Sequence, residues 1–321
     1  MNQGVSAFVL FEDDLIASGF FTLVDGNPAN RVARWNGTEW QAMGAGMNER
    51  VFGLALHNGE LFAGGNFLEA DGKMVYGMAR WDSVEWQPLA LDGMNEATNA
   101  LFSYDGHLIA GGRFTMAGEK TVNHVARWDG DDWHPLGLGL GNSNHHTPDV
   151  QAFTIYEGDL IAGGSFDLAG GKEAHFIARW DGAEWHPVGS GLHKIDFGGI
   201  YDLAIYEGDL VAAGRFMMAD GQTVHAARLI DGNWQPMGTG NGALALEVYE
   251  GELYASRNFI NEDSEMESHI ARWDGSGWQP VGVGDAGTNA LITYNGSLVA
   301  GGMFKNMDGQ VVNHVTEWTA H

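Results

Sequence analysis

The sequence predicts an all-β fold of seven similar antiparallel units. Three observations lead to this prediction. An Ala-Arg-Trp motif recurs along the 321 residues, 48 glycines punctuate the chain, and no long window has the 3.6-residue apolar period of a helix. A motif that returns every 44 to 52 residues is typical of a propeller or a solenoid. We therefore expect a seven-bladed β-propeller with four-stranded blades.

The arginine of the repeated motif marks each unit, and the seventh copy is degraded to Thr-Glu-Trp. The markers are Arg34, Arg80, Arg127, Arg179, Arg228, Arg272 and Glu317. Because the units are contiguous, we expect one domain over residues 1–321. The expected blades are about 1–46, 47–93, 94–141, 142–191, 192–240, 241–284 and 285–321.

The third unit shows the expected order of elements. Residues 99–104 alternate as a strand before an Asp-Gly turn, and residues 108–114 form a second strand. A loop leads to a third strand that ends at residue 128. A further Asp-Gly turn precedes a short fourth strand at residues 133–137. The same order in each unit predicts four strands per blade.

Glycine, tryptophan and proline each recur at a fixed place in the unit. The second strand ends in Gly-Gly in four units, which permits close approach of a neighbouring blade. All 12 tryptophans fall in third or fourth strands, as large apolar residues between blades would. Five of the seven prolines share one position of the fourth strand: Pro88, Pro135, Pro187, Pro236 and Pro280. Proline at that position indicates an outer edge strand.

This order of motifs resembles that of the kelch and galactose-oxidase-like propellers over essentially the whole chain. The chain is more similar still to tandem AGGxF…ARWDGxxWxPLG repeats of bacterial, often exported, proteins. The resemblance implies a propeller that serves either as an enzyme or as a binding scaffold. It does not extend to the copper chemistry of galactose oxidase, because the sequence contains no cysteine to form the cross-linked residue.

The last unit lacks a Trp-x-Pro-Leu segment, and residues 1–4 are too few to supply a fourth strand. We expect a three-stranded last blade with an open edge at residues 311–318. Such an edge is able to pair with another chain, including a second copy of this one.

Composition excludes several classes of partner and site. The 16 basic and 42 acidic residues give a net charge of −26, which repels nucleic acid phosphates. No apolar run reaches the 18 or so residues of a membrane span. Residues 1–11 do not have a signal-peptide pattern. We expect an extracellular or periplasmic protein whose signal peptide is not part of this sequence, and a cytoplasmic location remains open.

Two between-blade connections, residues 138–150 and 190–200, are longer than the others and carry histidine and aspartate. Imidazole and carboxylate groups from adjacent loops suit a divalent metal or proton transfer near neutral pH. The simpler interpretation is a set of surface side chains in a histidine-rich chain. The candidate metal ligands are His145, His146, Asp149, His193 and Asp196.

A second candidate site lies where the repeat varies near the predicted channel mouth. Asp202 stands where the other units have Gly or Ala, and with Tyr201 and Arg215 it would form a polar pocket. Arg113 would clamp an anionic ligand such as a uronic acid. The structural alternative is an Asp202–Arg215 ion pair. The candidate binding residues are Arg113, Tyr201, Asp202, Arg215, Asn66, Asn99 and Gln151.

The histidine that recurs before Ala-Arg-Trp, as in His124, His225, His269 and His314, is expected to be structural. Third strands of different blades lie too far apart for these residues to share a metal. The leading functional hypothesis is a binding propeller that presents its loop-rich face to a carbohydrate or a protein. The competing hypothesis is an enzyme, a metal-assisted hydrolase or a lyase acting on an acidic sugar. A third hypothesis is an assembly protein.

Overall fold

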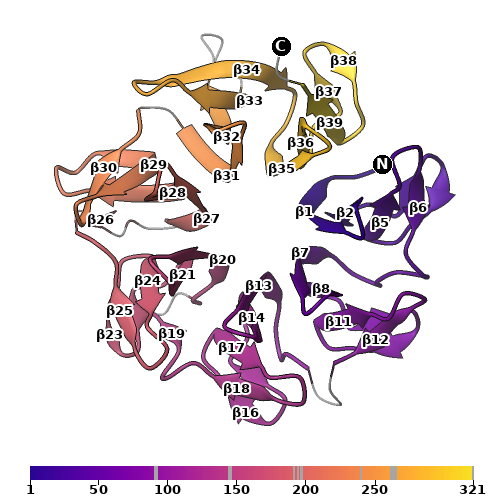
Figure 1. Ribbon diagram of the computed structural model, residues 1–321, viewed down its shortest axis with the longest axis horizontal. Coiled ribbons are helices and arrows are strands. Elements are labelled where there is room, and N and C mark those ends of the chain that lie inside the picture. Colours follow the sequence, from indigo (N-terminus) through magenta and orange to yellow (C-terminus); the bar gives the residue numbers. More distant parts are fainter. Residues whose placement is uncertain are drawn as a thin grey trace.

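The computed structural model describes residues 1–89, 93–143, 147–190, 192–193, 195, 198–238, 241–260 and 266–319; for 241–242, 257–260 and 266–268 it describes the backbone alone. Seven antiparallel sheets form a ring around a common axis, and the first and last sheets are neighbours (Figure 1). The predicted seven-bladed all-β architecture is confirmed. In the described part of the chain, no helix has the length and apolarity needed to cross a membrane.

The first four blades each contain four strands, which run in sequence order from the axis outward. Blade 1 consists of β1 (Val5–Phe11), β2 (Asp14–Gly19), β5 (Val32–Trp35) and β6 (Trp40–Ala42). Blade 2 consists of β7 (Val51–His57), β8 (Glu60–Gly65), β11 (Met78–Trp81) and β12 (Trp86–Pro88). Blade 3 consists of β13 (Thr98–Tyr104), β14 (His107–Gly112), β17 (Val125–Trp128) and β18 (Trp133–Pro135). Blade 4 consists of β20 (Val150–Tyr156), β21 (Asp159–Gly164), β24 (Ile177–Trp180) and β25 (Trp185–Pro187).

The last three blades depart from this pattern. Blade 5 consists of β27 (Gly199–Tyr206), β28 (Asp209–Met218), β29 (Thr223–Ile230) and β30 (Asn233–Pro236), with β26 (Leu192–His193) added to β28. Blade 6 consists of β31 (Asn241–Tyr249), β32 (Glu252–Ile260), β33 (Met266–Trp273) and β34 (Trp278–Gly284), with β37 (Asn306–Met307) added to β34. Blade 7 consists of β35 (Thr288–Tyr294), β36 (Ser297–Gly302) and β39 (Val315–Trp318). Among the described residues the last blade therefore has three strands, as predicted.

The connection between the second and third strands, predicted as a loop, is a small β-hairpin in five blades. The hairpins are β3 (Leu23–Val24) with β4 (Asn27–Pro28), β9 (Glu69–Ala70) with β10 (Lys73–Met74), β15 (Met116–Ala117) with β16 (Lys120–Thr121), β22 (Leu168–Ala169) with β23 (Lys172–Glu173), and β37 (Asn306–Met307) with β38 (Gln310–Val311). In blade 4, β19 (Leu140–Gly141) pairs with β22. At the tip of the second hairpin, Asp71 and Gly72 have φ values of 47° and 73°, as a tight two-residue turn requires.

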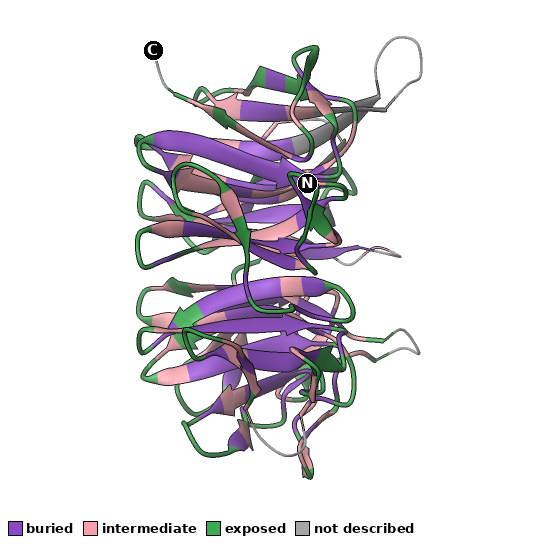
Figure 2. Cartoon of the chain, turned by 90° about the vertical axis from the view of Figure 1, so that its right-hand side faces the viewer, coloured by how far each residue is buried: buried purple, intermediate pink, exposed green. Residues whose placement is uncertain are grey.

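The hairpins and the between-blade connections lie on one face of the ring, called here the hairpin face. Strands are buried through the thickness of the ring, and exposed residues gather at the turns of both faces (Figure 2). The Gly-Gly pairs pack as predicted. A Cβ atom on Gly111 would lie 2.6 Å from Val150 of the next blade, and one on Gly301 would lie 2.6 Å from Phe8.

The fourth-strand tryptophans join successive blades through their indole N–H groups. Each of four donates to a main-chain carbonyl of the preceding blade: Trp86 to Met43 at 3.1 Å, Trp185 to Leu136 at 3.0 Å, Trp234 to Val188 at 3.0 Å and Trp278 to Met237 at 2.8 Å. The tryptophans are therefore both apolar fillers, as predicted, and hydrogen-bond donors.

Inner strands carry a β-bulge at their second residue or, in β27, at their third residue, next to the hairpin face. A bulged residue is left out of the ladder, and its side chain is redirected. The bulged residues are Ser6, Phe52, Asn99, Gln151, Tyr201 and Asn289. Three of the predicted binding residues thus share one structural position, around the mouth of the ring.

Candidate binding groove

The residue after Gly-Gly, which varies from blade to blade, contacts the start of the next blade. The Arg50 guanidinium lies 4.8 Å from the centre of the Phe20 ring. Ser165 Oγ donates to Gly198 O at 3.1 Å, and Arg113 Nε donates to the carboxylate of Asp149 at 3.2 Å. These three variable residues are therefore each matched to a different partner, and their variation has a structural cause.

The Arg113–Asp149 contact is part of a four-residue cluster between blades 3 and 4. The Asp149 side chain is only 9% exposed, and it also accepts hydrogen bonds from Asn99 Nδ2 and, at 3.4 Å, from Gln151 Nε2. Burial raises the pKa of Asp149 above its usual value, and Arg113 is the main opposing influence. The structure thus unites three predicted binding residues with a residue predicted to bind metal.

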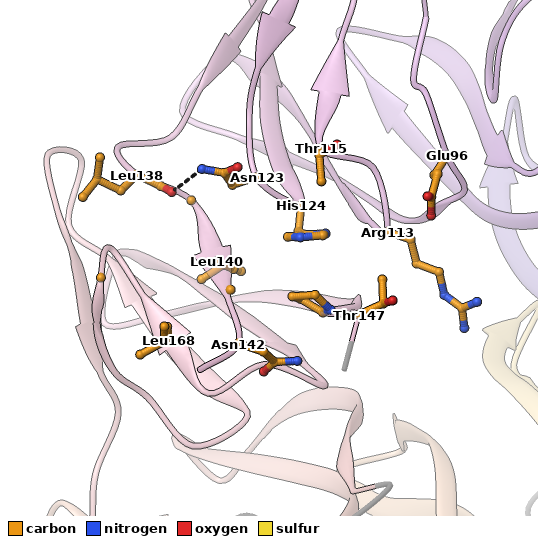
Figure 3. A pocket seen from close by; sticks show the side chains of 14 residues that line it. Glu96, Arg113, Thr115, Asn123, His124, Leu138, Leu140, Asn142, Thr147 and Leu168 are labelled. Atoms are coloured by element: carbon orange, nitrogen blue, oxygen red, sulfur yellow. Dashed lines mark hydrogen bonds between the residues drawn. The ribbon is translucent and has the colours of Figure 1, made fainter. Parts of the chain in front are cut away.

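A groove of about 490 Å³ begins at Arg113 and runs outward between blades 3 and 4 (Figure 3). Glu96, Arg113 and Thr115 lie toward the axis, while Leu138 and Leu168 lie toward the rim. The Arg113 side chain is 58% exposed although its Nε is bound to Asp149. The groove therefore presents an oriented guanidinium group at its inner end.

Several other groups on the groove wall are engaged within the fold. Asn123 Nδ2 donates to Leu138 O at 3.0 Å, and Asn142 Oδ1 accepts from Asp167 N at 2.8 Å. His124 is buried, which lowers its pKa and favours the neutral ring near pH 7. Glu96, Arg113, Thr115 and Thr147 also have polar side chains on the groove wall, and of these four only Arg113 was predicted.

The polar pocket predicted around Asp202 is built differently. The two Asp202 oxygens accept Leu203 N–H at 2.8 Å and, from the next blade, Leu246 N–H at 2.7 Å. Leu246 follows a second register shift in β31. Asp202 therefore accepts a backbone N–H that lies beside an interruption of the strand pairing. Burial raises the pKa of Asp202 to about 7. A structural role thus accounts for its departure from Gly or Ala.

Tyr201 and Arg215 lie near each other at the mouth of the ring. Burial raises the pKa of Tyr201, and the positive charge of Arg215 opposes this shift. Arg215 is exposed, as is Asn66 at the same repeat position in blade 2. Their part in binding stays a prediction.

Two solved structures share the architecture of this chain. The computationally designed Ika8 protein has a TM-score of 0.51 and 14% sequence identity, over 100% of this chain and 97% of the designed one. The WD40 β-propeller domain of Doa1 has a TM-score of 0.52 and 13% identity, over 95% of this chain and 92% of that domain. The chain is a β-propeller. No protein-family model and no curated protein matches it, so the likeness covers the fold alone.

The predicted metal ligands are only partly described in this propeller. His145, His146 and Asp196 lie outside the described residues. Asp149 is directed into the Arg113 cluster, while the His193 ring stacks on His175 with 5.8 Å between centres. No group of three or more His, Asp or Glu side chains suited to a metal occurs within the part of the chain that the structure describes. The metal site stays a prediction.

Two of the recurring histidines, His225 and His314, bond within their own blades. His225 Nδ1 lies 3.0 Å from Gly214 O, and His314 Nδ1 lies 3.2 Å from Gly302 O. Each ring thus links the third strand to the end of the second strand. This supports the structural interpretation of the motif.

Proposed function

We propose that this protein is a non-catalytic binding propeller whose groove between blades 3 and 4 holds a short carbohydrate bearing a carboxylate. The observation that carries the proposal is Arg113, held through Nε by a buried Asp149 and still 58% exposed. A guanidinium group fixed in this way matches the planar geometry of a carboxylate.

The size and lining of the groove support a small ligand. Its volume of about 490 Å³ is in the ordinary range for small-molecule sites. Thr115, Thr147 and Glu96 offer hydroxyl and carboxylate groups to sugar hydroxyls, and Leu138, which is 71% exposed, offers an apolar surface. The net charge of −26 disfavours long polyanions, so a short acidic oligosaccharide fits better than an extended one.

The kelch-like assignment and a location outside the cytoplasm are part of the same proposal, because sugar ligands of this type occur there. An enzyme acting on the same substrates would need an acid–base pair or a metal facing the ligand. Binding needs neither, because Arg113 alone is positioned to hold a carboxylate, so binding is the function that the groove supports best.

Calorimetry with a uronic-acid oligosaccharide and its neutral counterpart tests the proposal. We expect binding of the acidic sugar, and a loss of roughly 10- to 100-fold in affinity for Arg113→Ala, as expected for a hydrogen bond to a charged group. Arg215→Ala distinguishes this groove from the predicted site at the mouth of the ring, since Arg215 occupies the same repeat position two blades away and does not line the groove. Equal affinities for the two sugars, or an equal loss in both variants, would contradict a site in this groove.

A further inference from the structure

Among the described residues, none fills the junction between blades 7 and 1 in the way that a fourth-strand segment fills the other junctions. In blade 4, Trp185 packs on Trp180 with 5.4 Å between ring centres, and the chain continues through Pro187 and Val188 to Gly189. Val188 O accepts the Trp234 indole of blade 5, and a Cβ atom on Gly189 would lie 2.5 Å from Leu229. A Trp-x-Pro-Val-Gly segment therefore completes one blade and covers the tryptophan of the next.

Blade 7 has the unpaired strand edge and the third-strand tryptophan on which such a segment packs in the other blades. No described residue pairs as a strand with the outer edge of β39, which pairs with β36 alone. Trp318 takes the usual third-strand place, because a Cβ atom on Gly282 of blade 6 would lie 2.8 Å from its ring. A pocket of about 290 Å³ lies beside this edge, lined by Trp35, Trp40, Val315, Thr316 and Glu317 among others.

We propose that this pocket and the β39 edge bind an extended peptide strand of the type Trp-x-Pro-(Leu, Val or Met)-Gly that lies outside these 321 residues. The intact blades give its register. In blade 3, Trp133 pairs with Trp128, His134 with Arg127 and Pro135 with Ala126. The docked tryptophan accordingly pairs with Trp318, the residue x with Glu317, and the proline with Thr316.

Trp40 anchors the far end of the docked strand. It stands at the position of Trp86, Trp185 and Trp234, whose indoles donate to the carbonyl three residues after the tryptophan of the preceding blade. Those three are buried, whereas Trp40 is half-buried and lines the pocket. The carbonyl of the residue after the proline would accept the Trp40 indole N–H.

The negative charge of Glu317 on the β39 edge favours a basic residue at position x of the docked strand. In the other blades the third-strand residue at this position is arginine, paired in blades 1 and 2 with Asp14 and Glu60 on the second strand. Blade 7 has Glu317 there, and its second strand begins with Ser297. A basic residue at x would face Glu317 across the strands, and opposite charges at such positions attract.

A second copy of this chain does not supply the strand. Its own segments of this type are paired within their blades: Trp86, Trp133, Trp185 and Trp234 are exposed by 0%, 1%, 1% and 4%, and Trp278, which is half-buried, pairs with Trp273 and donates to Met237 O. Donating one would open a blade. The occupant is therefore a peptide segment outside these 321 residues, bound by strand addition.

Fluorescence polarisation with labelled nine-residue peptides tests the proposal on the 321-residue protein. We expect Ser-Gly-Trp-Lys-Pro-Val-Gly-Val-Gly to bind saturably, a scrambled peptide not to bind, and Glu in place of Lys to weaken binding roughly two- to tenfold. Glu317→Lys should reverse this preference. Glu250→Lys, an exposed change in a blade 6 turn, should leave it unchanged.

Three results would overturn the proposal. They are no binding by either peptide, a Lys-over-Glu preference that survives Glu317→Lys, and a dimer in solution whose β39 edge is occupied by a second copy. Because this pocket lies at the junction of blades 7 and 1, none of these results bears on the groove between blades 3 and 4.

Discussion

The indole hydrogen bond between blades can be isolated by substituting two tryptophans that differ in it. Trp86 is fully buried, pairs with Trp81 at 5.3 Å, and donates to Met43 O at 3.1 Å. Trp133 is 1% exposed and pairs with Trp128 at the same 5.3 Å, but its Nε1 has no partner among the described residues. The two side chains therefore share their packing and differ in the hydrogen bond.

Trp86→Phe removes apolar contact and leaves the buried Met43 carbonyl without the indole. Trp133→Phe removes similar apolar contact and also removes an unpaired buried donor. We expect Trp86→Phe to lower the free energy of unfolding by about 1 to 3 kcal/mol more than Trp133→Phe, the usual cost of leaving a buried polar group unpaired. Urea unfolding followed by circular dichroism measures the difference, provided that both variants keep the wild-type m-value. Equal losses would refute the view that the indoles join blades by hydrogen bonding.

Two further predictions concern stability. The pKa of Asp202 is raised to about 7 in the fold and is near 3.9 in the unfolded chain, so its ionisation lowers the free energy of unfolding by roughly 4 kcal/mol as pH rises from about 4 to about 7. Asp202→Asn should lack this pH-dependent loss. Unfolding of both proteins at pH 4.5 and pH 8 checks whether the wild type loses more stability between the two pH values. Gly301→Ala should lower the free energy of unfolding by about 1 to 3 kcal/mol, because the added Cβ would meet Phe8 and Val5 of the first blade at 2.6 to 2.7 Å. Gly287→Ala, whose added Cβ has no neighbour within 4 Å, should have no effect in the same thermal melt.

The sequence sufficed for the blades because their determinants are local and repeated. Gly-Gly, the tryptophan pair and the edge proline each recur at one place, and each has the predicted role in the structure. The hairpins were missed because their strands are only two residues long, as in β9 (Glu69–Ala70), so no alternation of apolar and polar residues can develop. Asp71-Gly72 is the signal that the sequence offers for the second hairpin, because an Asp-Gly pair favours a tight two-residue turn.

The candidate site could be predicted only in part, because its contacts join residues of neighbouring blades. Arg113 and Asn99 belong to one repeat and Asp149 to the next, 36 and 50 residues further along the chain. Aligning the repeats places Arg113 beside its counterparts in other blades and does not reveal its partner. Asp149 was therefore assigned to a metal site with His145, although its carboxylate is engaged with Arg113.

Variation within a repeat is a poor guide to function until the neighbouring blade is considered. Arg113, Ser165 and Phe20 differ because what they contact differs: Asp149, Gly198 and Arg50. A binding residue differs from a structural one in the part of its side chain that stays exposed after it has bonded to its partner in the neighbouring blade. The Arg113 side chain is 58% exposed beside a groove, while both carboxylate oxygens of Asp202 accept hydrogen bonds from backbone N–H groups. By the same reasoning, Glu317 and Trp40 stand out, because the partner segment that other blades provide is not among the described residues and both side chains line the pocket beside the β39 edge.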